Sequence, residues 1–327
     1  MSVWEQIGSL ARLAPSPHNT QPFRILPRDE QTADLVAFTD RFLPREDHGN
    51  LYVASSFGTF AAAVERAARH FGIWLTVTPR PGINPPMLTK AGPRVTLGTA
   101  TIVSTGEADP QFPILDARRT SRLPYRDRLI HPAALAAFGE TAKTWQHRFL
   151  AYDDPGIVKP LLRLNANAII DNLQLDDERD EIRGWYRIGP TPQFGDGLWQ
   201  QPMNQPAWEL RSAFIMPSIF AWPGLRQFAV HRYLRTQRGT RHIALICGRF
   251  LEWPDLYAAG RMLFELWIEM ARHGVYMQPM GSMLTNPRYS AEIARRFGVD
   301  DCWLVIRMGY SDTPPRAPRL ESILISS

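Results

Sequence analysis

The chain is poor in cysteine. Its 327 residues include only Cys247 and Cys302, which lie far apart in the sequence and inside the apolar runs IALICG and CWLVIRMG. Two distant cysteines give neither the repeated spacing of a disulfide framework nor that of a metal site. We therefore expect both to be buried, inert thiols, and we expect no bound metal.

Long apolar runs are also lacking. No window reaches the roughly 18 uncharged apolar residues that a membrane-spanning helix needs. The opening residues, MSVWEQIGSLARLAPSP, include an acid and no continuous apolar stretch, so they do not resemble a secretory signal. With 44% hydrophobic and 21% charged residues, the chain has the composition of a globular protein. We expect a cytoplasmic protein that does not bind membranes.

Lysine is rare as well, at positions 90, 143 and 159 only, so 37 basic residues minus 3 lysines leaves 34 arginines. The net charge is +5, yet no run of five basic residues occurs and acids are interleaved throughout. This pattern argues against a nucleic-acid-binding face. Arginine binds phosphate in a bidentate manner, so a few arginines could instead hold an anionic cofactor.

Hydrophobic periodicity predicts a mixed chain of helices and strands. A long helix is expected from about Val53 to Phe71, with Gly72 as its cap, and a second over WPDLYAAGRMLFELWIEMARHG, closed by Gly274. Shorter helices are expected over 3–14, 131–145, 155–175 and 287–297. The expected strands are FRIL, DLVAF, IWLTVTP, RVTLGTATIVST, HRFLAY, RHIALICG, VYMQP and CWLVIRMG.

The two halves of the chain resemble one another. AARHFGIW (67–74) and ARHGVYM (271–277) both end a long helix, pass through glycine and enter a strand. This echo predicts a duplicated domain, with halves 1–112 and 113–327, equivalent to a homodimer fused into one chain. Residues 176–240 fit neither copy. With four tryptophans they form either a lid over a flat ligand or a packing segment between domains.

Four short segments carry candidate binding groups. The loop Pro15-Ser16-Pro17-His18-Asn19-Thr20-Gln21 offers donors and acceptors held by two prolines, although its composition alone favours an ordinary turn. The segment Arg118-Arg119-Thr120-Ser121-Arg122 could hold a phosphate, or could be a solvated basic turn. Pro279-Met280-Gly281 could present free amides to a ring, or simply end a strand. Arg316 and Arg319 could complete the phosphate site.

Together these segments resemble the FMN-dependent nitroreductase family. PSPHNTQPF is similar to that family's PSxxNxQPW segment, RRTSRLPY to its RRSxRxF phosphate motif, and Pro-Met-Gly to its flavin-edge loop. Phe23 stands where tryptophan is usual. Since the first half has only the PSPHNTQPF loop and the second only the basic cluster, one site can be completed. That arrangement resembles the fused, single-chain Acg-like branch of the family.

The resemblance implies an α+β fold of nitroreductase type, a three-layer α/β/α architecture in two tandem copies that form an intramolecular pseudo-dimer. It implies that Arg118, Arg119 and Thr120 hold the FMN phosphate with Arg316 or Arg319, and that Arg122 lies near the N1/O2 edge of the flavin. Around the flavin ring it places Pro279, Met280 and Gly281 on one side and, from the other half, Pro15, Ser16, Pro17, Asn19 and Gln21.

The implied function is that of an FMN oxidoreductase. Hydride would pass from NAD(P)H to the flavin and then to a small-molecule acceptor such as a nitroaromatic or a quinone, with no side chain acting as general acid or base. The alternative is a non-catalytic protein that stores FMN beneath a closed lid. Because the dimer interface would be internal, we expect a monomer with one FMN.

Overall fold

Two four-stranded antiparallel sheets form the framework of the chain, and the structure, a computed structural model, describes residues 1–189, 191 and 194–326. The first sheet has the order β1-β2-β4-β3, with β1 (Phe23–Pro27), β2 (Thr32–Phe38), β3 (Ile73–Pro79) and β4 (Arg94–Thr105). The second has the order β5-β8-β10-β9, with β5 (Arg148–Tyr152), β8 (His242–Cys247), β9 (Tyr276–Pro279) and β10 (Cys302–Gly309). The expectation of a mixed chain of helices and sheets is confirmed.

The two sheets have corresponding connections. In each, a long helix joins the second strand of the spatial order to the fourth: α2 (Leu51–His70) lies between β2 and β3, and α10 (Trp253–Arg272) between β8 and β9. A further helix packs on each long one, α1 (Val3–Ala11) on α2 and α4 (Pro132–Thr144) on α10. These helices form where apolar residues recur at three-to-four spacing, and the capping box of Ser2 and Glu5 begins α1.

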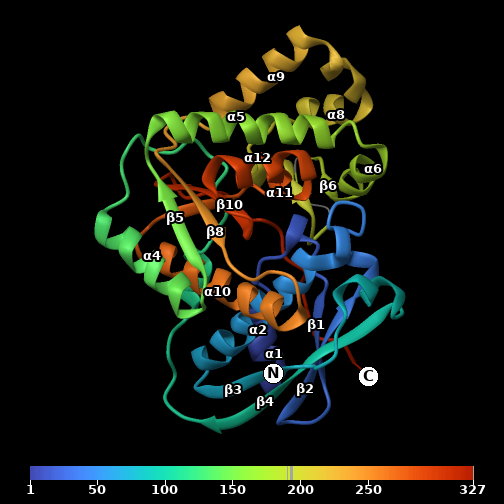
Figure 1. Cartoon of the computed structure of the whole chain (residues 1–327). Helices are drawn as coiled ribbons and strands as arrows, with labels where there is room; N and C mark the ends of the chain where they lie inside the picture. Colours follow the sequence, from blue (N-terminus) through green and yellow to red (C-terminus); the bar gives the residue numbers. More distant parts are fainter. Residues whose placement is uncertain (190, 192–193, 327) are drawn as a thin grey trace.

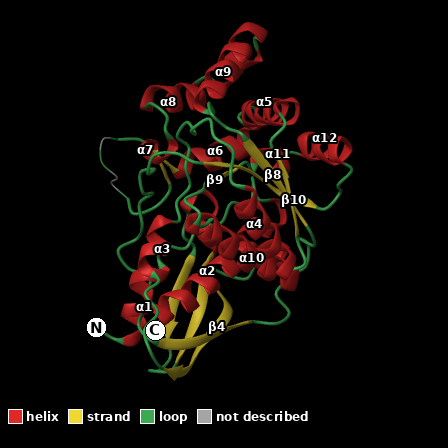
Figure 2. Cartoon of the chain, turned by 90° about the vertical axis from the view of Figure 1, so that its left-hand side faces the viewer, coloured by secondary structure: helices red, strands yellow, loops and turns green. Residues whose placement is uncertain are grey.

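The helices α2 and α10 lie between the two sheets and pack directly on each other (Figures 1 and 2). Their backbones meet at two glycines: a Cβ on Gly260 would lie 1.7 Å from the carbonyl oxygen of Ser55, and a Cβ on Gly58 2.1 Å from that of Tyr257. One side of α10 joins the apolar cluster of the first sheet and another side joins that of the second. This crossing is therefore the centre of the core.

The second sheet is covered on both faces. Along β8 every residue is buried; Ala244 and Ile246 pack with α10 and α4, whereas Ile243, Leu245 and Cys247 pack beneath α5 (Pro155–Asn172) and α12 (Pro287–Phe297). This half has the expected three layers. In the first sheet, side chains along β3 alternate between core and solvent, so that part of the sheet has one exposed face.

The remaining helices lie mostly in residues 176–240, of which α8 and α9 lie above α5, whereas α6 and β6 lie lower, at the side of the molecule (Figure 1). They comprise α6 (Asp176–Trp185), α7 (Gln200–Met203), α8 (Ala207–Ile215) and α9 (Pro223–Thr236), with a short two-stranded sheet of β6 (Tyr186–Arg187) and β7 (Leu198–Trp199). Two others, α3 (Phe112–Ala117) and α11 (Ser282–Thr285), lie outside this region. Within the described residues no helix is both long enough and apolar enough to span a bilayer.

The segment after β10 returns to the first sheet. The amide of Ile25 in β1 donates to the carbonyl of Ile323 at 2.8 Å, and the amide of Ile325 donates to the carbonyl of Ile25 at 3.1 Å. Leu324 then packs against Gly8 of α1. A Cβ on Gly8 would lie 2.5 Å from the Cδ1 methyl of Leu324. Residues 310–325 thus cross from the second sheet to the first.

Candidate functional site

The loop at residues 15–21 has an unusual backbone. His18, Asn19 and Gln21 have φ of 47°, 55° and 50°, and they are three of the six non-glycine residues with positive φ in the described chain. The left-handed region is disfavoured for L-residues, and such strain concentrates at sites where a side chain must be held in a set direction. This backbone makes the loop a candidate site, to be judged by what its side chains contact.

Polar side chains of this loop bond to two other segments. Asn19 Nδ2 donates to the carbonyls of Gly197 at 3.1 Å and Pro318 at 2.9 Å. Gln21 Nε2 donates to the carbonyl of Gly195 at 2.8 Å, and its Oε1 accepts from the amide of Leu320 at 3.1 Å. The loop is thus covered by residues 195–197 of the insertion and by residues 318–320.

Within the loop itself, Ser16 Oγ accepts the amide of Gln21 at 2.8 Å, and Pro17 begins a 3₁₀ turn (Pro17–Asn19). The carbonyl of Pro15 accepts the hydroxyl of Thr59 on α2 at 2.9 Å. These bonds fix the loop to the central helix α2, so its position is set by the core.

The arginines predicted to bind phosphate come together from distant segments. Asp116 forms ion pairs with both Arg119 and Arg316. Arg118 and Arg319 both donate to the carbonyl of Leu13, at 2.7 and 3.4 Å, and Arg319 also donates to Asn19 Oδ1. We call this group, comprising Arg118, Arg119, Arg316 and Arg319, the arginine cluster. It lies at the meeting point of the loop, the end of α3 and the returning segment.

The arginine cluster carries more positive charge than its contacts compensate. Burial and the nearby charge of Arg319 lower the pKa of Arg118 to about 9, and burial with Arg316 and Arg12 lowers that of Arg319 to about 10. Among the described residues, Arg118 Nε and Arg319 Nε are buried without a hydrogen-bond partner. A buried guanidinium with a free N–H is costly, and an anion such as phosphate would satisfy it.

The segment 118–122 also adjoins the strand that leads to Pro279. Thr120 forms a parallel bridge with Met277, and the amide of Ser121 donates to the carbonyl of Met277 at 3.1 Å. The Met280 amide, however, donates to the carbonyl of Val305 at 2.8 Å, so the expectation of a free amide there is wrong. The physical reason is that strand pairing with β10 continues one residue past Pro279. Gly281 then caps α11.

Arg122 and Arg307 form a second pair of neighbouring arginines. Burial, and to a lesser extent the charge of Arg307, lowers the pKa of Arg122. Arg307 is fully buried in β10. Its guanidinium donates to the carbonyl of Leu123 at 2.5 Å and to Gln237 Oε1, and its Cζ lies 3.9 Å from the centre of the Tyr125 ring. Sequence reasoning missed Arg307. The signal was a charged residue inside the otherwise apolar run CWLVIRMG.

His18 adds a titratable group to the loop. Its Nε2 lies 2.9 Å from a carboxylate oxygen of Glu46. Burial alone would lower the pKa of His18, but the charge and hydrogen bond of Glu46 outweigh it and raise the pKa, while Arg122 acts in the opposite direction. His18, Glu46 and Arg122 therefore share one charge network at the junction of the loop and the segment 118–122.

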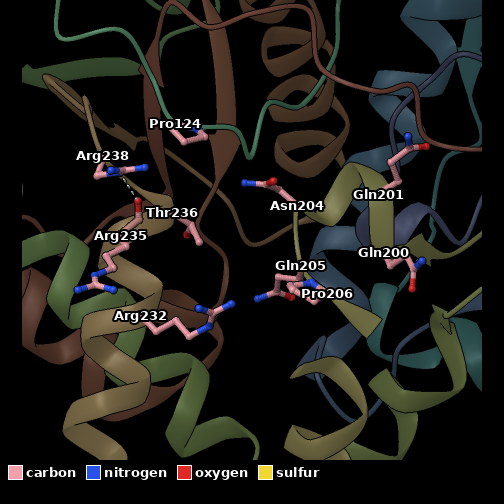
Figure 3. Close-up of a pocket in the computed structure, with 10 residues that line it drawn as sticks. All are labelled: Pro124, Gln200, Gln201, Asn204, Gln205, Pro206, Arg232, Arg235, Thr236 and Arg238. Atoms are coloured by element: carbon pink, nitrogen blue, oxygen red, sulfur yellow. Dashed lines mark hydrogen bonds between the residues drawn. The ribbon is translucent and has the colours of Figure 1, made fainter. Parts of the chain in front are cut away.

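A cavity of about 570 Å³ lies in the insertion, beside the end of this segment. Three arginines of α9 and its C-terminal turn, Arg232, Arg235 and Arg238, form one wall, and the side-chain amides of Asn204 and Gln205 point toward them across the cavity (Figure 3). Asn204 connects this cavity to the segment 118–122, since its Nδ2 donates to the carbonyl of Arg122 at 3.1 Å. The lining is suited to an anionic molecule.

The tryptophans of the insertion do not act together. Trp208 and Trp222 are 62% and 72% exposed, whereas Trp185 stacks with the guanidinium groups of Arg41 and Arg187. The contacts that cover the loop come instead from the glycine-rich turn at 195–197. The interpretation of the whole segment 176–240 as a lid or as a packing segment between domains therefore stays open, with the turn at 195–197 as its contact to the loop.

Among the described residues, no group of three or more His, Cys, Asp or Glu side chains is placed to hold a metal ion.

Comparison with known proteins gives structural likenesses only. No family model and no curated protein matches the chain. Among solved structures, the FMN-dependent nitroreductase NfnB from Mycobacterium smegmatis, in complex with NADPH, is 17% identical over 63% of this chain and 92% of its own, with a TM-score of 0.37. The FMN- and NADPH-dependent NfnB from sphigopyxis sp. strain HMH has 17% identity, 62% and 92% coverage and a TM-score of 0.35.

A nitroreductase with bound FMN from Bacteroides fragilis is 13% identical over 66% of this chain and 98% of its own, with a TM-score of 0.34. Identities and TM-scores at this level do not by themselves establish a shared fold. What can be proposed for this chain rests on its own residues and their contacts.

Proposed function

We propose that the chain is an FMN-binding oxidoreductase of nitroreductase type, built as two tandem copies that form an intramolecular pseudo-dimer. The observation that carries the proposal is the arginine cluster, in which four guanidinium groups from two distant segments meet beside the strained loop 15–21. The corresponding strand orders of the two sheets and the central packing of α2 on α10 support the fused arrangement.

The residues present fit FMN. The free, buried N–H groups of Arg118 and Arg319 are suited to a phosphate. Thr120 would add its hydroxyl, and Arg119, which already donates to Asp116 and to the carbonyl of Pro314, would add its charge. Arg122 would provide positive charge near the pyrimidine edge of the flavin, with Arg307 behind it. The ring would lie between the loop residues Pro15, Ser16, Pro17, Asn19 and Gln21 and the turn Pro279, Met280 and Gly281, where Gly281 rather than Met280 offers the amide.

When bound, FMN supplies the hydride and electron transfer that no side chain of the chain provides. The chain's own residues would bind the cofactor, orient it and exclude water from it. The buried arginines favour negative charge at the two ends of the ligand, and the fixed loop sets its position. The cavity beside Arg122, with Arg232, Arg235 and Arg238, is suited to the phosphates of NAD(P)H.

The rival function is FMN storage, and one observation favours it. Gly195 and Gly197 bond to Gln21 and Asn19, so the turn of the insertion occupies the polar groups that would contact the flavin edge or an incoming co-substrate. If this turn stays closed over bound FMN, the nicotinamide cannot reach it. The two proposals therefore differ in whether the turn opens.

Anaerobic titration of the purified, flavin-loaded protein with NADPH separates them. Loss of the flavin absorbance within seconds supports the oxidoreductase; an unchanged spectrum, with dithionite reducing the same sample, supports storage. A colourless protein that fails to take up added FMN would refute both proposals. We expect one FMN per chain because the loop and the arginine cluster meet at one site. We expect a monomer in sizing experiments because the pseudo-dimer interface is internal.

A further inference from the structure

The two cysteines, although far apart in the sequence, lie directly opposite each other in the second sheet. Cys247 ends β8 and Cys302 begins β10, and the two are paired across the antiparallel ladder. Residues directly opposite in such a ladder have Cα atoms about 4.5–5.5 Å apart, which is within the range that a disulfide spans. The amide of Gly248 donates to the carbonyl of Asp301 at 3.0 Å and fixes the register beside the pair.

Both thiols point to the same face of the sheet. They belong to the apolar cluster beneath α5 and α12, and the thiol of Cys302 donates a weak hydrogen bond to the carbonyl of Leu304 at 3.8 Å. A β-bulge lies between Cys302 and Leu304. Bulges bend the strand locally, so the backbone can adjust to a bond between the sulfurs.

Only one of the two thiols can be reached from outside. Cys247 is fully buried, whereas Cys302 is half-buried and lines a cavity of about 380 Å³. The lining includes the carboxyl groups of Glu46, Asp47, Asp300 and Asp301, together with Arg249 and His48. Glu46 and Asp301 are paired with His18 and Arg148, and burial raises the pKa of Asp47 to about 7, so the excess of negative charge rests mainly on Asp300 and the ionised fraction of Asp47. A small cation is therefore favoured in this cavity over an anion.

We propose that Cys247 and Cys302 form a reversible cross-strand disulfide, made when Cys302 reacts with a small cationic disulfide that enters this cavity. The Cys302 sulfur attacks one sulfur of the reagent, and the first half leaves as a thiol carrying the Cys302 proton. The Cys247 sulfur then attacks Cys302, and the second half leaves as a thiol carrying the Cys247 proton. The protein loses two electrons and two hydrogens, and the reagent gains both.

The test uses the folded full chain and cystamine, a cationic disulfide, with the product followed by intact mass. Wild type is expected to lose two hydrogens and to retain no reagent, and peptide mapping is expected to join residues 247 and 302. Cys247→Ser is expected to stop at a mixed disulfide on Cys302, because the second thiol is missing. Cys302→Ser is expected to react at least about tenfold more slowly, because Cys247 is inaccessible.

The outcomes that overturn the proposal are equally defined. A wild-type chain that stays unmodified, or that keeps the reagent as a stable mixed disulfide, would show that the sulfurs cannot meet. Unfolding the same samples in guanidinium should make both cysteines reactive, which confirms that the reagent is competent. Because the mapping uses wild-type protein, the result does not depend on the folding of either serine variant.

Discussion

The crossing of α2 and α10 gives the sharpest stability prediction, for Gly260→Ala. The new Cβ would lie 1.7 Å from the carbonyl oxygen of Ser55 and 3.0 Å from the Cα of Gly58. Real Cβ atoms essentially never come closer than 3.0 Å to another heavy atom, so the backbones must separate by at least 3.0 − 1.7 = 1.3 Å. Because backbone rather than a flexible side chain is in the way, this separation disturbs both apolar clusters.

Two effects oppose each other in this substitution. Alanine is favoured over glycine in a helix by about 1 kcal/mol, which would stabilise the chain. Overpacking a close contact costs about 1–3 kcal/mol and more where backbone must move. We expect the second to win at the upper end of its range, so that the free energy of unfolding falls by about 2 kcal/mol, a large part of the roughly 5–15 kcal/mol of a typical protein.

Urea denaturation followed by circular dichroism measures the effect. Gly139→Ala is the matched control, since Gly139 also lies inside a helix, α4, but a Cβ there meets nothing within 4 Å. It should gain up to about 1 kcal/mol from helix propensity alone. If Gly260→Ala were as stable as wild type or more stable, the close approach of the two helices would be refuted.

The remaining predictions concern the site. The double variant Arg118→Ala with Arg119→Ala should lose FMN during gel filtration while its circular dichroism spectrum stays unchanged. The control variant Arg295→Ala, which removes an exposed arginine of α12, should retain FMN. Stoichiometric FMN in the double variant would contradict the phosphate assignment. Arg235→Gln with Arg238→Gln should raise the KM for NADPH about tenfold or more with little change in kcat, since charge-assisted hydrogen bonds of about 1.5–3 kcal/mol are lost; an equal fall in kcat would place these residues elsewhere in the reaction. The pKa of His18 is raised in the folded chain, so its pairing with Glu46 should stabilise the folded chain fully below the ordinary histidine pKa and lose that effect as the pH rises through the raised pKa. Glu46→Gln should therefore lower the free energy of unfolding more at pH 6 than at pH 8. An equal loss at both pH values would refute the ion pair.

Much of the fold could be predicted because it depends on local patterns. Apolar residues that recur every 3.6 residues predicted both long helices, and apolar runs or alternation with a period of 2 predicted every strand of the two main sheets. The helix over 287–297 and the strand CWLVIRMG have the expected bounds. The helices within 176–240 were not predicted. There the apolar positions follow no single period, and several apolar side chains on α8 and α9, such as Trp208 and Phe228, face solvent.

Contacts that depend on strand register could not be predicted from local patterns. Cys247 meets Cys302 only because β8 and β10 pair in one particular register, which is a long-range property. The same holds for Met280, whose amide is used by Val305. By contrast, an excess of arginine is a chemical signal that needs no register, and it associated the segments 118–122 and 316–319 from the sequence alone. The structure brings Arg316 to Asp116, beside the first segment, while their joint role in binding phosphate stays a prediction.

The returning segment 310–325 has a consequence for the order of folding. Its bonds to Ile25 close a loop of about 300 residues, at an entropic cost of about 5 kcal/mol or more. Contacts so distant in sequence form slowly, so we expect this segment to dock after both sheets have folded. Arg316 and Arg319 travel with it. We therefore expect the arginine cluster to be completed in the last step. A chain arrested before that step should have a nearly native core but lack the phosphate affinity that we propose for the cluster.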